Sequence, residues 1–301
     1  MPTPAEQIAQ RRARLREYET ALNQRAADLR QRRRLLERER RALAQLEKER
    51  PVRGPDLNYF VGPSWQRWFR RLDSATHLLI ALNVGLFLVD WLLRAVLPAS
   101  GGLFALGAKF GPAIVLGHQY WRLVTAAFLH GGMLHLLLNT YALAYLGPPL
   151  EQVLGVDKFL LVYLAGGITG NAISTLLFPM VVSIGSSSAI FGLLGYFLFV
   201  RLAASHLLTP TGARSIAMLI GVNLLFGFLP GTHVDNGAHL GGLLGGLLAG
   251  VLVGPPAYGR DLGRQWPMAY RVLAAAALLG VWVLSVLPRT LGWGWQLSSP
   301  L

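Results

Sequence analysis

The sequence predicts an all-α, polytopic membrane helical bundle preceded by a long N-terminal helix. Apolar residues make up 53% of the 301 residues, charged residues only 14%, and the mean hydropathy is +0.42, so most of the chain is suited to a lipid solvent. The charge is concentrated at one end, because residues 1–50 hold 14 of the 28 Lys and Arg and 8 of the 15 Asp and Glu. We therefore expect a basic arm and a nearly uncharged body.

The arm, residues 1–50, reads as one helix, since no Gly or Pro occurs between Ala5 and Arg50. An apolar residue recurs every seven positions, at Ile8, Leu15, Leu22, Leu29, Leu36 and Leu43. The second core position of each heptad is poor, with Arg11, Tyr18, Arg25 and Arg32. A weak coiled coil that allows self-association, or a single helix on anionic lipid, fits better than a stable zipper. A nucleic-acid partner for the arginine run 32–34 is not expected, because charge runs beside a membrane are usually topology signals.

Residues 51–74 are expected to be a linker and an interfacial anchor. Pro51 and the Gly- and Pro-bearing stretch after it end the helix. The aromatic and basic residues that follow are typical of a segment at the membrane interface; they are Trp65, Trp68, Phe69, Arg70 and Arg71. A signal peptide is not expected, because the first long apolar run begins near Ala75.

Seven apolar runs follow, each suited to one membrane span. They cover residues 75–97, 133–150, 157–179, 186–204, 214–230, 236–253 and 268–287. Several are shorter than the ~20 residues that a lone span prefers, so neighbouring helices should shield them from lipid. The connection over 98–132 is long for a membrane loop and is expected to fold back into the interface.

Basic residues predict the orientation. With the arm in the cytoplasm, the inner segments collect six of them, namely Lys158, Arg201, Arg214, Arg260, Arg264 and Arg271. The outer segments then keep only Lys109, Arg122 and Arg289. The positive-inside rule favours this choice over the opposite one. We expect a multi-pass protein of a bacterial inner membrane, with a cytoplasmic N-terminus.

Polar residues inside spans are costly and mark function by default. The second, fourth and sixth spans run from outside to inside in this orientation, and each carries its polar residues near its start. These residues are His130, His135 and Asn139, then Ser186, Ser187 and Ser188, then Asn236 and His239. They should therefore lie at a similar depth, just below the outer surface.

Four charged residues in or beside the spans have simpler explanations. Asp90 and Arg94 are expected to form an ion pair within the first span, and Glu151 and Asp157 are expected to cap helices.

Stripes of small residues predict that the fourth and sixth spans touch. The stripes are Ser188, Gly192 and Gly195 on one span, and His239, Gly242, Gly246 and Gly250 on the other. An imidazole would then face a hydroxyl, which is the nucleophile–base pair of acyl transfer, with no carboxylate nearby to orient the imidazole. Gly185 would allow a sharp turn into the fourth helix. The unpaired N–H groups of its first turn, with His135 and Asn139, could hold an oxyanion.

These residues carry a family resemblance. The runs His130-Gly-Gly-Met-Leu-His135-Leu-Leu-Leu-Asn139, Gly185-Ser-Ser187-Ser and Ala238-His239-Leu-Gly-Gly242 resemble the three signature motifs of the rhomboid intramembrane serine proteases. Trp121-Arg122 is similar to the Trp-Arg pair in that family's first extracellular loop. Ser188 stands where the family often has Gly, a departure that keeps the residue small.

The resemblance, over about residues 75–255, implies a six-helix catalytic core, with residues 256–301 adding a loop, a seventh span and a tail. It implies Ser187 as nucleophile, because the family pattern places it two residues after Gly185, and His239 as general base. It also implies an oxyanion hole made by His135, Asn139 and the Ser187 N–H. The reaction implied is cleavage of transmembrane protein substrates near the outer face of the bilayer.

Simpler interpretations stand beside these. Serines and glycines at a helix start are often only packing residues, and His130 is either a structural hydrogen-bonding residue or a direct part of the site. A metal site is not expected, because the chain has no Cys and no His-Glu-x-x-His run, and His130 and His135 would lie on different faces of a helix. No cofactor is expected. The alternative function is a non-catalytic protein of the same fold that binds or escorts membrane helices.

Overall fold

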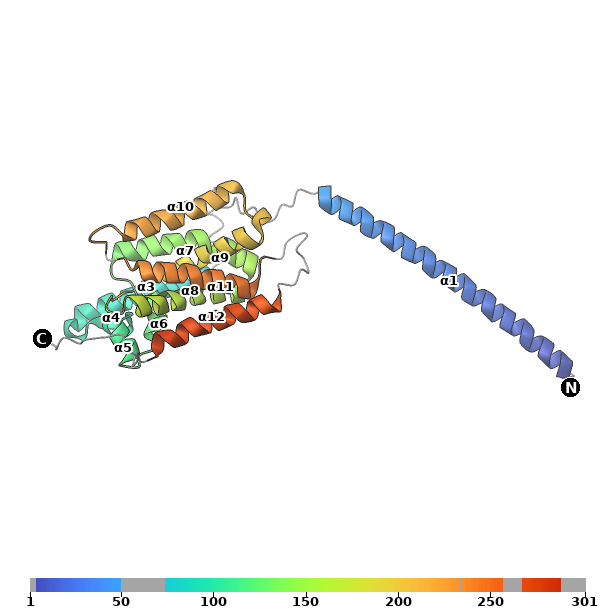
Figure 1. Ribbon diagram of the computed structural model, residues 1–301, viewed down its shortest axis with the longest axis horizontal. Helices are drawn as coiled ribbons and strands as arrows, with labels where there is room; N and C mark the ends of the chain where they lie inside the picture. The colour runs from blue at the N-terminus through green and yellow to red at the C-terminus, as the bar shows by residue number, and fades with distance from the viewer. Residues whose placement is uncertain (1–3, 50–73, 233, 257–266, 288–301) are drawn as a thin grey trace. The chain divides into compact units, whose positions relative to one another are not determined.

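The computed structural model describes residues 4–49, 74–232, 234–256 and 267–287 (Figure 1). The chain divides into two compact units, residues 1–53 and 54–301. The first unit is the helix α1 (Pro4–Glu49), as the sequence predicts. Its leucines at positions 15, 22, 29 and 36 are 61–66% exposed, so no described residue of this unit covers this part of the heptad stripe. The predicted interfacial anchor lies outside the described residues.

The second unit is helical, with no strand among its described residues. Its long helices are α3 (Ala75–Val96), α7 (Met133–Leu154), α8 (Val156–Leu177), α9 (Ser187–Ala203), α10 (Pro210–Gly227), α11 (Asn236–Val253) and α12 (Met268–Val286). The short ones are η2 (Pro98–Ser100), α4 (Gly102–Gly107), α5 (Gly111–Val115), α6 (Arg122–Thr125), η3 (Ala126–Phe128) and η4 (Ser205–Leu207). The seven long helices coincide with the seven predicted apolar runs, and the all-α prediction is confirmed.

Four of these helices, α3, α8, α11 and α12, are each long and apolar enough to cross a membrane. The α7 helix passes the same test together with the segment Arg122–Phe128, although the two are bent by 92° at the break between them. Only 17 residues long, α9 is almost entirely buried among its neighbours. A short span shielded by other helices is what the sequence predicts.

The centre of the bundle is the packing of α8, α9 and α11, with α10 on one side and α12 on the other (Figure 1). A Cβ added at Gly246 of α11 would lie 1.8 Å from the carbonyl oxygen of Gly192 on α9, so these two backbones touch. The predicted contact between the two stripes is therefore confirmed. The sequence analysis missed the third partner: a Cβ at Gly166 of α8 would lie 2.5 Å from the Gly192 Cα.

The connection over 98–132 folds into the short elements η2, α4, α5, α6 and η3. Arg122 fastens it from within, because its guanidinium donates hydrogen bonds to the carbonyl oxygens of Ala105 (2.6 Å) and Ala108 (2.7 Å). Trp121 Nε1 likewise donates to Leu106 O at 3.0 Å. The Trp-Arg pair thus holds the loop in a compact form beside the bundle.

Two further predictions concern charged residues. Arg94 Nη2 lies 2.6 Å from Asp90 Oδ2, which confirms the ion pair within α3. The Glu151 carboxylate, near the end of α7, caps the start of α3 by accepting hydrogen bonds from the N–H groups of Ala75 (2.7 Å) and Thr76 (2.9 Å). This cap joins two helices at the end of α7 far from His135.

Candidate active site

The two residues at the centre of the site come from α9 and α11. Ser187 is the first residue of α9, and its Oγ lies 3.0 Å from Nε2 of His239, in the first turn of α11. The close approach of the two helix backbones along their small-residue stripes makes this distance attainable. A hydroxyl and an imidazole nitrogen at hydrogen-bonding distance form a pair that can transfer a proton.

The three neighbouring serines differ in their surroundings. Ser187 is half-buried and faces His239, whereas Ser186 is fully buried, with its Oγ 3.4 Å from Nε2 of His130. Ser188 is 2% exposed and its side chain packs towards α8, where a Cβ added at Gly170 would lie 2.7 Å from the Cβ of Ser188. Only Ser187 therefore combines partial exposure with the imidazole.

Gly185 makes the turn into α9 with φ +126°, a conformation that side chains rarely adopt. Its N–H donates to Ala126 O at 2.9 Å, which ties the turn to η3. A Cβ at this position would also lie 2.7 Å from Nε2 of His135 and 3.6 Å from Nδ2 of Asn139. The structure therefore brings His135 and Asn139 against the turn that precedes Ser187.

His130 does not lie where the sequence analysis placed it. It precedes α7, which starts at Met133, so His130 and His135 do not occupy two faces of one helix. Their ring centroids are 5.2 Å apart, because the chain turns between them. His130 is 2% exposed and its one close polar partner among the described side chains is Ser186. It thus approaches Ser186, the residue before Ser187.

Two nearby residues escaped the sequence analysis. Phe191, one turn after Ser187 on α9, stacks on the ring of His239. Asp235 caps α11 by accepting the Ala238 N–H (3.0 Å), and it stands one turn before His239. A carboxylate thus stands close to His239 in the chain, but it does not orient the imidazole: the Asp235 oxygens bond to other groups, and Nδ1 of His239 has no hydrogen-bond partner among the described residues. An N-cap Asp four positions before His239 was the missed signal.

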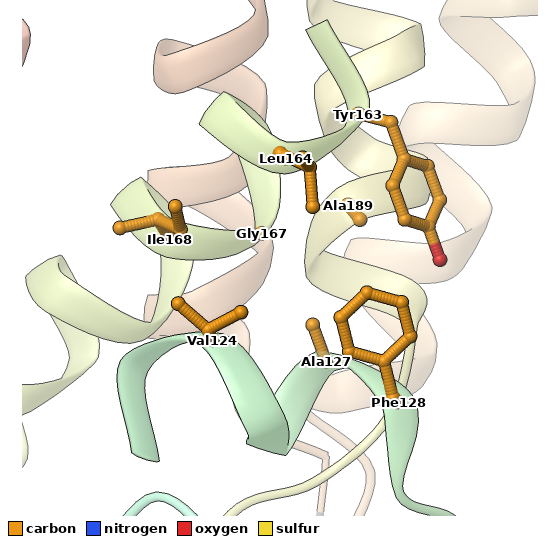
Figure 2. A pocket seen from close by; sticks show the side chains of 8 residues that line it. All are labelled: Val124, Ala127, Phe128, Tyr163, Leu164, Gly167, Ile168 and Ala189. Carbon is orange, nitrogen blue, oxygen red and sulfur yellow. The ribbon is translucent and has the colours of Figure 1, made fainter. Parts of the chain in front are cut away.

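An apolar recess lies where α6 and η3 meet α8 (Figure 2). Its lining consists of Val124, Ala127, Phe128, Tyr163, Leu164, Gly167, Ile168 and Ala189. The Tyr163 hydroxyl is its only side-chain polar atom, so the recess offers apolar contact and no general base. Its lining does not include Ser187, His239, His135 or Asn139.

A rhomboid domain model matches residues 117–256, the segment that holds every polar residue just described. The chain is also 39% identical over 196 residues to the rhomboid protease GluP of Bacillus subtilis, covering 62% of this chain and 37% of that one. The chain belongs to the rhomboid family. With its apolar helices, this rhomboid is a multi-pass integral membrane protein.

Other relatives carry the same family name. RHOMBOID-like protein 7 of Arabidopsis thaliana is 41% identical over 147 residues, 48% of this chain and 46% of that one. Rhomboid-like protease 3 of Toxoplasma gondii is 33% identical over 148 residues, 49% of this chain and 53% of that one. This rhomboid thus spans only about two fifths to one half of the length of these relatives.

Proposed function

We propose that this rhomboid is an intramembrane serine endopeptidase that cleaves transmembrane protein substrates near the outer face of the membrane. Ser187 is the nucleophile and His239 is the general base. The observation that carries the proposal is the 3.0 Å separation of Ser187 Oγ and His239 Nε2. The names of the relatives support it, since GluP is called a rhomboid protease.

The pair can carry out acylation, the transfer of the acyl group of the scissile peptide bond to Ser187. His239 Nε2 takes the hydroxyl proton as Ser187 Oγ attacks the carbonyl carbon of the scissile peptide bond. The tetrahedral intermediate collapses when the protonated imidazole gives that proton to the leaving amine, which leaves an acyl-enzyme on Ser187. Water deprotonated by His239 then attacks the ester, and the Ser187 hydroxyl is restored as the acid product leaves. Each proton taken is returned, so the enzyme ends the cycle unchanged.

The negative oxygen of the intermediate needs donors. Ser187 opens α9, and the first N–H groups of a helix have no partner within it. The side chains of His135 and Asn139 lie against Gly185, two residues before the nucleophile, and can supply further donors. Donors fixed before the reaction stabilise the charge as it develops.

The membrane orientation remains part of the proposal. The distribution of Lys and Arg favours a cytoplasmic N-terminus in a bacterial inner membrane, with the starts of α7, α9 and α11 near the outer face. Substrates would then be cut near their outer ends. Cleavage in inverted and right-side-out vesicles, using a substrate tagged at both ends, tests this orientation.

The decisive experiment is cleavage of a generic transmembrane substrate by the purified full chain in detergent. Wild type is expected to cleave it, and Ser187→Ala and His239→Ala to lower kcat by several orders of magnitude. Ser186→Ala and Ser188→Ala are the matched controls, since each removes a neighbouring hydroxyl that does not face His239. Both should keep substantial activity.

Labelling with a fluorophosphonate followed by peptide mapping reports the nucleophile directly. Modification of Ser186 or Ser188 would contradict the assignment of Ser187. A folded wild-type chain that binds transmembrane helices, yet neither cleaves nor labels, would make this rhomboid the non-catalytic helix-binding protein instead.

A further inference from the structure

A buried ion pair lies beside the site and has no part in the chemistry just described. Lys109, between α4 and α5, has a fully buried side chain, and its Nζ lies 3.7 Å from Oδ2 of Asp235. The Asp235 side chain is itself only 7% exposed. The pair joins two segments that lie more than a hundred residues apart in the sequence, and each partner also makes contacts within its own surroundings.

Lys109 holds the segment that leads to Ser187. Its Nζ donates to Phe178 O at 2.9 Å and to Val181 O at 2.8 Å, the carbonyl groups that follow the end of α8. Its own backbone pairs with Ser183, N to O at 2.9 Å in one direction and 3.1 Å in the other. Side chain and main chain of one residue thus fix residues 178–183, and Ser187 follows four residues later.

Asp235 holds the start of the helix that carries His239. One carboxylate oxygen caps α11 through the Ala238 N–H, and the other accepts the hydroxyl of Ser174, near the end of α8. The backbone carbonyl of Asp235 also accepts the His239 N–H at 3.1 Å, which closes the first turn. A shift of Asp235 would therefore carry His239 with it.

We propose that Lys109 and Asp235 are positioning residues, which hold the start of α11 against residues 178–183 so that His239 Nε2 meets Ser187 Oγ. This inference rests on the proposed peptidase function and adds two residues to that same site. A buried ion pair contributes little net stability compared with an apolar replacement, because desolvation offsets the attraction, but its directional contacts can define a geometry. Reacting groups must be held within about 0.5 Å, and a misplacement of about 1 Å can cost about 100-fold in rate.

The test uses the full chain in detergent, with the variants Lys109→Met and Asp235→Asn. Asn keeps the shape and the N-capping oxygen Oδ1, but it replaces Oδ2, the oxygen that pairs with Lys109 and accepts from Ser174, by an amide NH2 group. We expect kcat and the rate of fluorophosphonate labelling of Ser187 to fall about 10- to 100-fold, with KM within about twofold of wild type. Because the ion pair couples the two residues, the double variant should lose less activity than the product of the two single losses.

Glu151→Gln is the matched control for lost stability. It also alters a buried carboxylate that joins two helices, but at the far end of α7. We expect a lower Tm with unchanged kcat per folded molecule. Ser174→Ala is a milder variant that removes one hydrogen bond from Asp235, keeps both charges, and should lower kcat less than Asp235→Asn does.

A readout that needs no activity is the nitrogen-15 NMR signal of His239 Nε2, which reports its hydrogen bond to Ser187. We expect this signal to move in Lys109→Met and Asp235→Asn and to stay in place in Glu151→Gln. The positioning role is overturned if Tm falls while the signal, the labelling rate and kcat all remain those of wild type. If wild type itself neither cleaves nor labels, the peptidase proposal fails, and an unmoved His239 signal in the variants would still overturn the positioning role separately.

Discussion

The ring of Phe191 lies almost parallel to the imidazole of His239, with the two centroids 4.3 Å apart and the planes 14° from parallel. Phe191 stands one turn after Ser187 on α9, and it is 3% exposed. The helix that presents the hydroxyl therefore also presents the surface on which the imidazole rests. Ser187 and the support for its base move as one body.

This stacking leads to the first prediction. Phe191→Leu keeps an apolar side chain but removes the flat face, and stacked aromatic pairs contribute about 0.5–1.5 kcal/mol beyond burial. We expect kcat to fall about two- to tenfold, since 1.36 kcal/mol corresponds to tenfold in rate. Phe191→Tyr, which keeps the ring, is the control and should retain most of the activity. Equal rates for the Leu variant and wild type would show that His239 needs no ring beneath it.

The sequence predicted the parts of this fold that depend on periodic patterns. The seven helices and the Asp90–Arg94 pair follow from the spacing of residues within a single segment. The contact between α9 and α11 follows from two stripes of small residues, each of which is visible along its own helix. The nearness of Ser187 to His239 was also predicted, because small residues allow helices to approach and both groups stand at the same end.

Contacts between distant segments could not be found in this way. Two such contacts depend on how the helices are arranged in space: the backbone contact of Gly166 on α8 with Gly192, and the ion pair of Lys109 with Asp235. No local pattern encodes that order. His130 was misplaced for a related reason, since the turn before α7 removes it from the helical register that the spacing implied.

The second prediction concerns the oxyanion. His135 and Asn139 both lie against Gly185, and losing one such donor typically costs about 2.7–4 kcal/mol, or about 100- to 1,000-fold in kcat. His135→Ala and Asn139→Ala should therefore each leave weak but measurable cleavage. Leu138→Ala, at a 58% exposed position of the same helix, is the control and should cleave normally. Normal cleavage by both donor variants would leave the oxyanion to backbone N–H groups alone.

The third prediction concerns the backbone contact of α9 and α11. A methyl group at Gly246 would lie 1.8 Å from the Gly192 carbonyl oxygen, a distance that forces the helices apart. Gly246→Ala should lower Tm strongly and reduce the folded fraction, as measured by thermal unfolding in detergent. Gly85→Ala is the matched control, because a Cβ on that glycine of α3 has no atom within 4 Å. The control should unfold at or slightly above the wild-type temperature. A Gly246 variant as stable as the control would mean that the two helices are not in backbone contact.

The fourth prediction follows from the burial of Lys109, which lowers the pKa of its ammonium group from about 10.5 to about 8. Between these two values the unfolded chain holds a proton that the folded chain has released. Stability therefore rises with pH across that window, and this residue adds no slope below or above it. Lys109→Met should show a smaller rise than wild type when unfolding is measured from pH 7.5 to 10.5. Identical slopes for the two proteins would mean that folding does not lower the pKa of Lys109.

The last prediction concerns α1. Residues 1–50 carry 14 basic and 8 acidic side chains, a net charge of +6, and the leucine stripe of α1 is exposed within its own unit. Basic side chains near an anionic leaflet are attracted by about 1 kcal/mol each, an attraction that salt screens. We expect a peptide of residues 1–50 to bind anionic vesicles with an affinity that falls as salt rises. Neutral vesicles serve as the control.

All the residues that build the proposed site lie between positions 109 and 239, so a chain lacking residues 1–50 should cleave a generic substrate in detergent about as fast as the full chain. Loss of self-association in that truncated chain, measured by its size in detergent, would identify the arm as an oligomerisation element. A truncated chain that is folded but inactive would contradict this separation of roles, because it would make α1 necessary for the chemistry of Ser187.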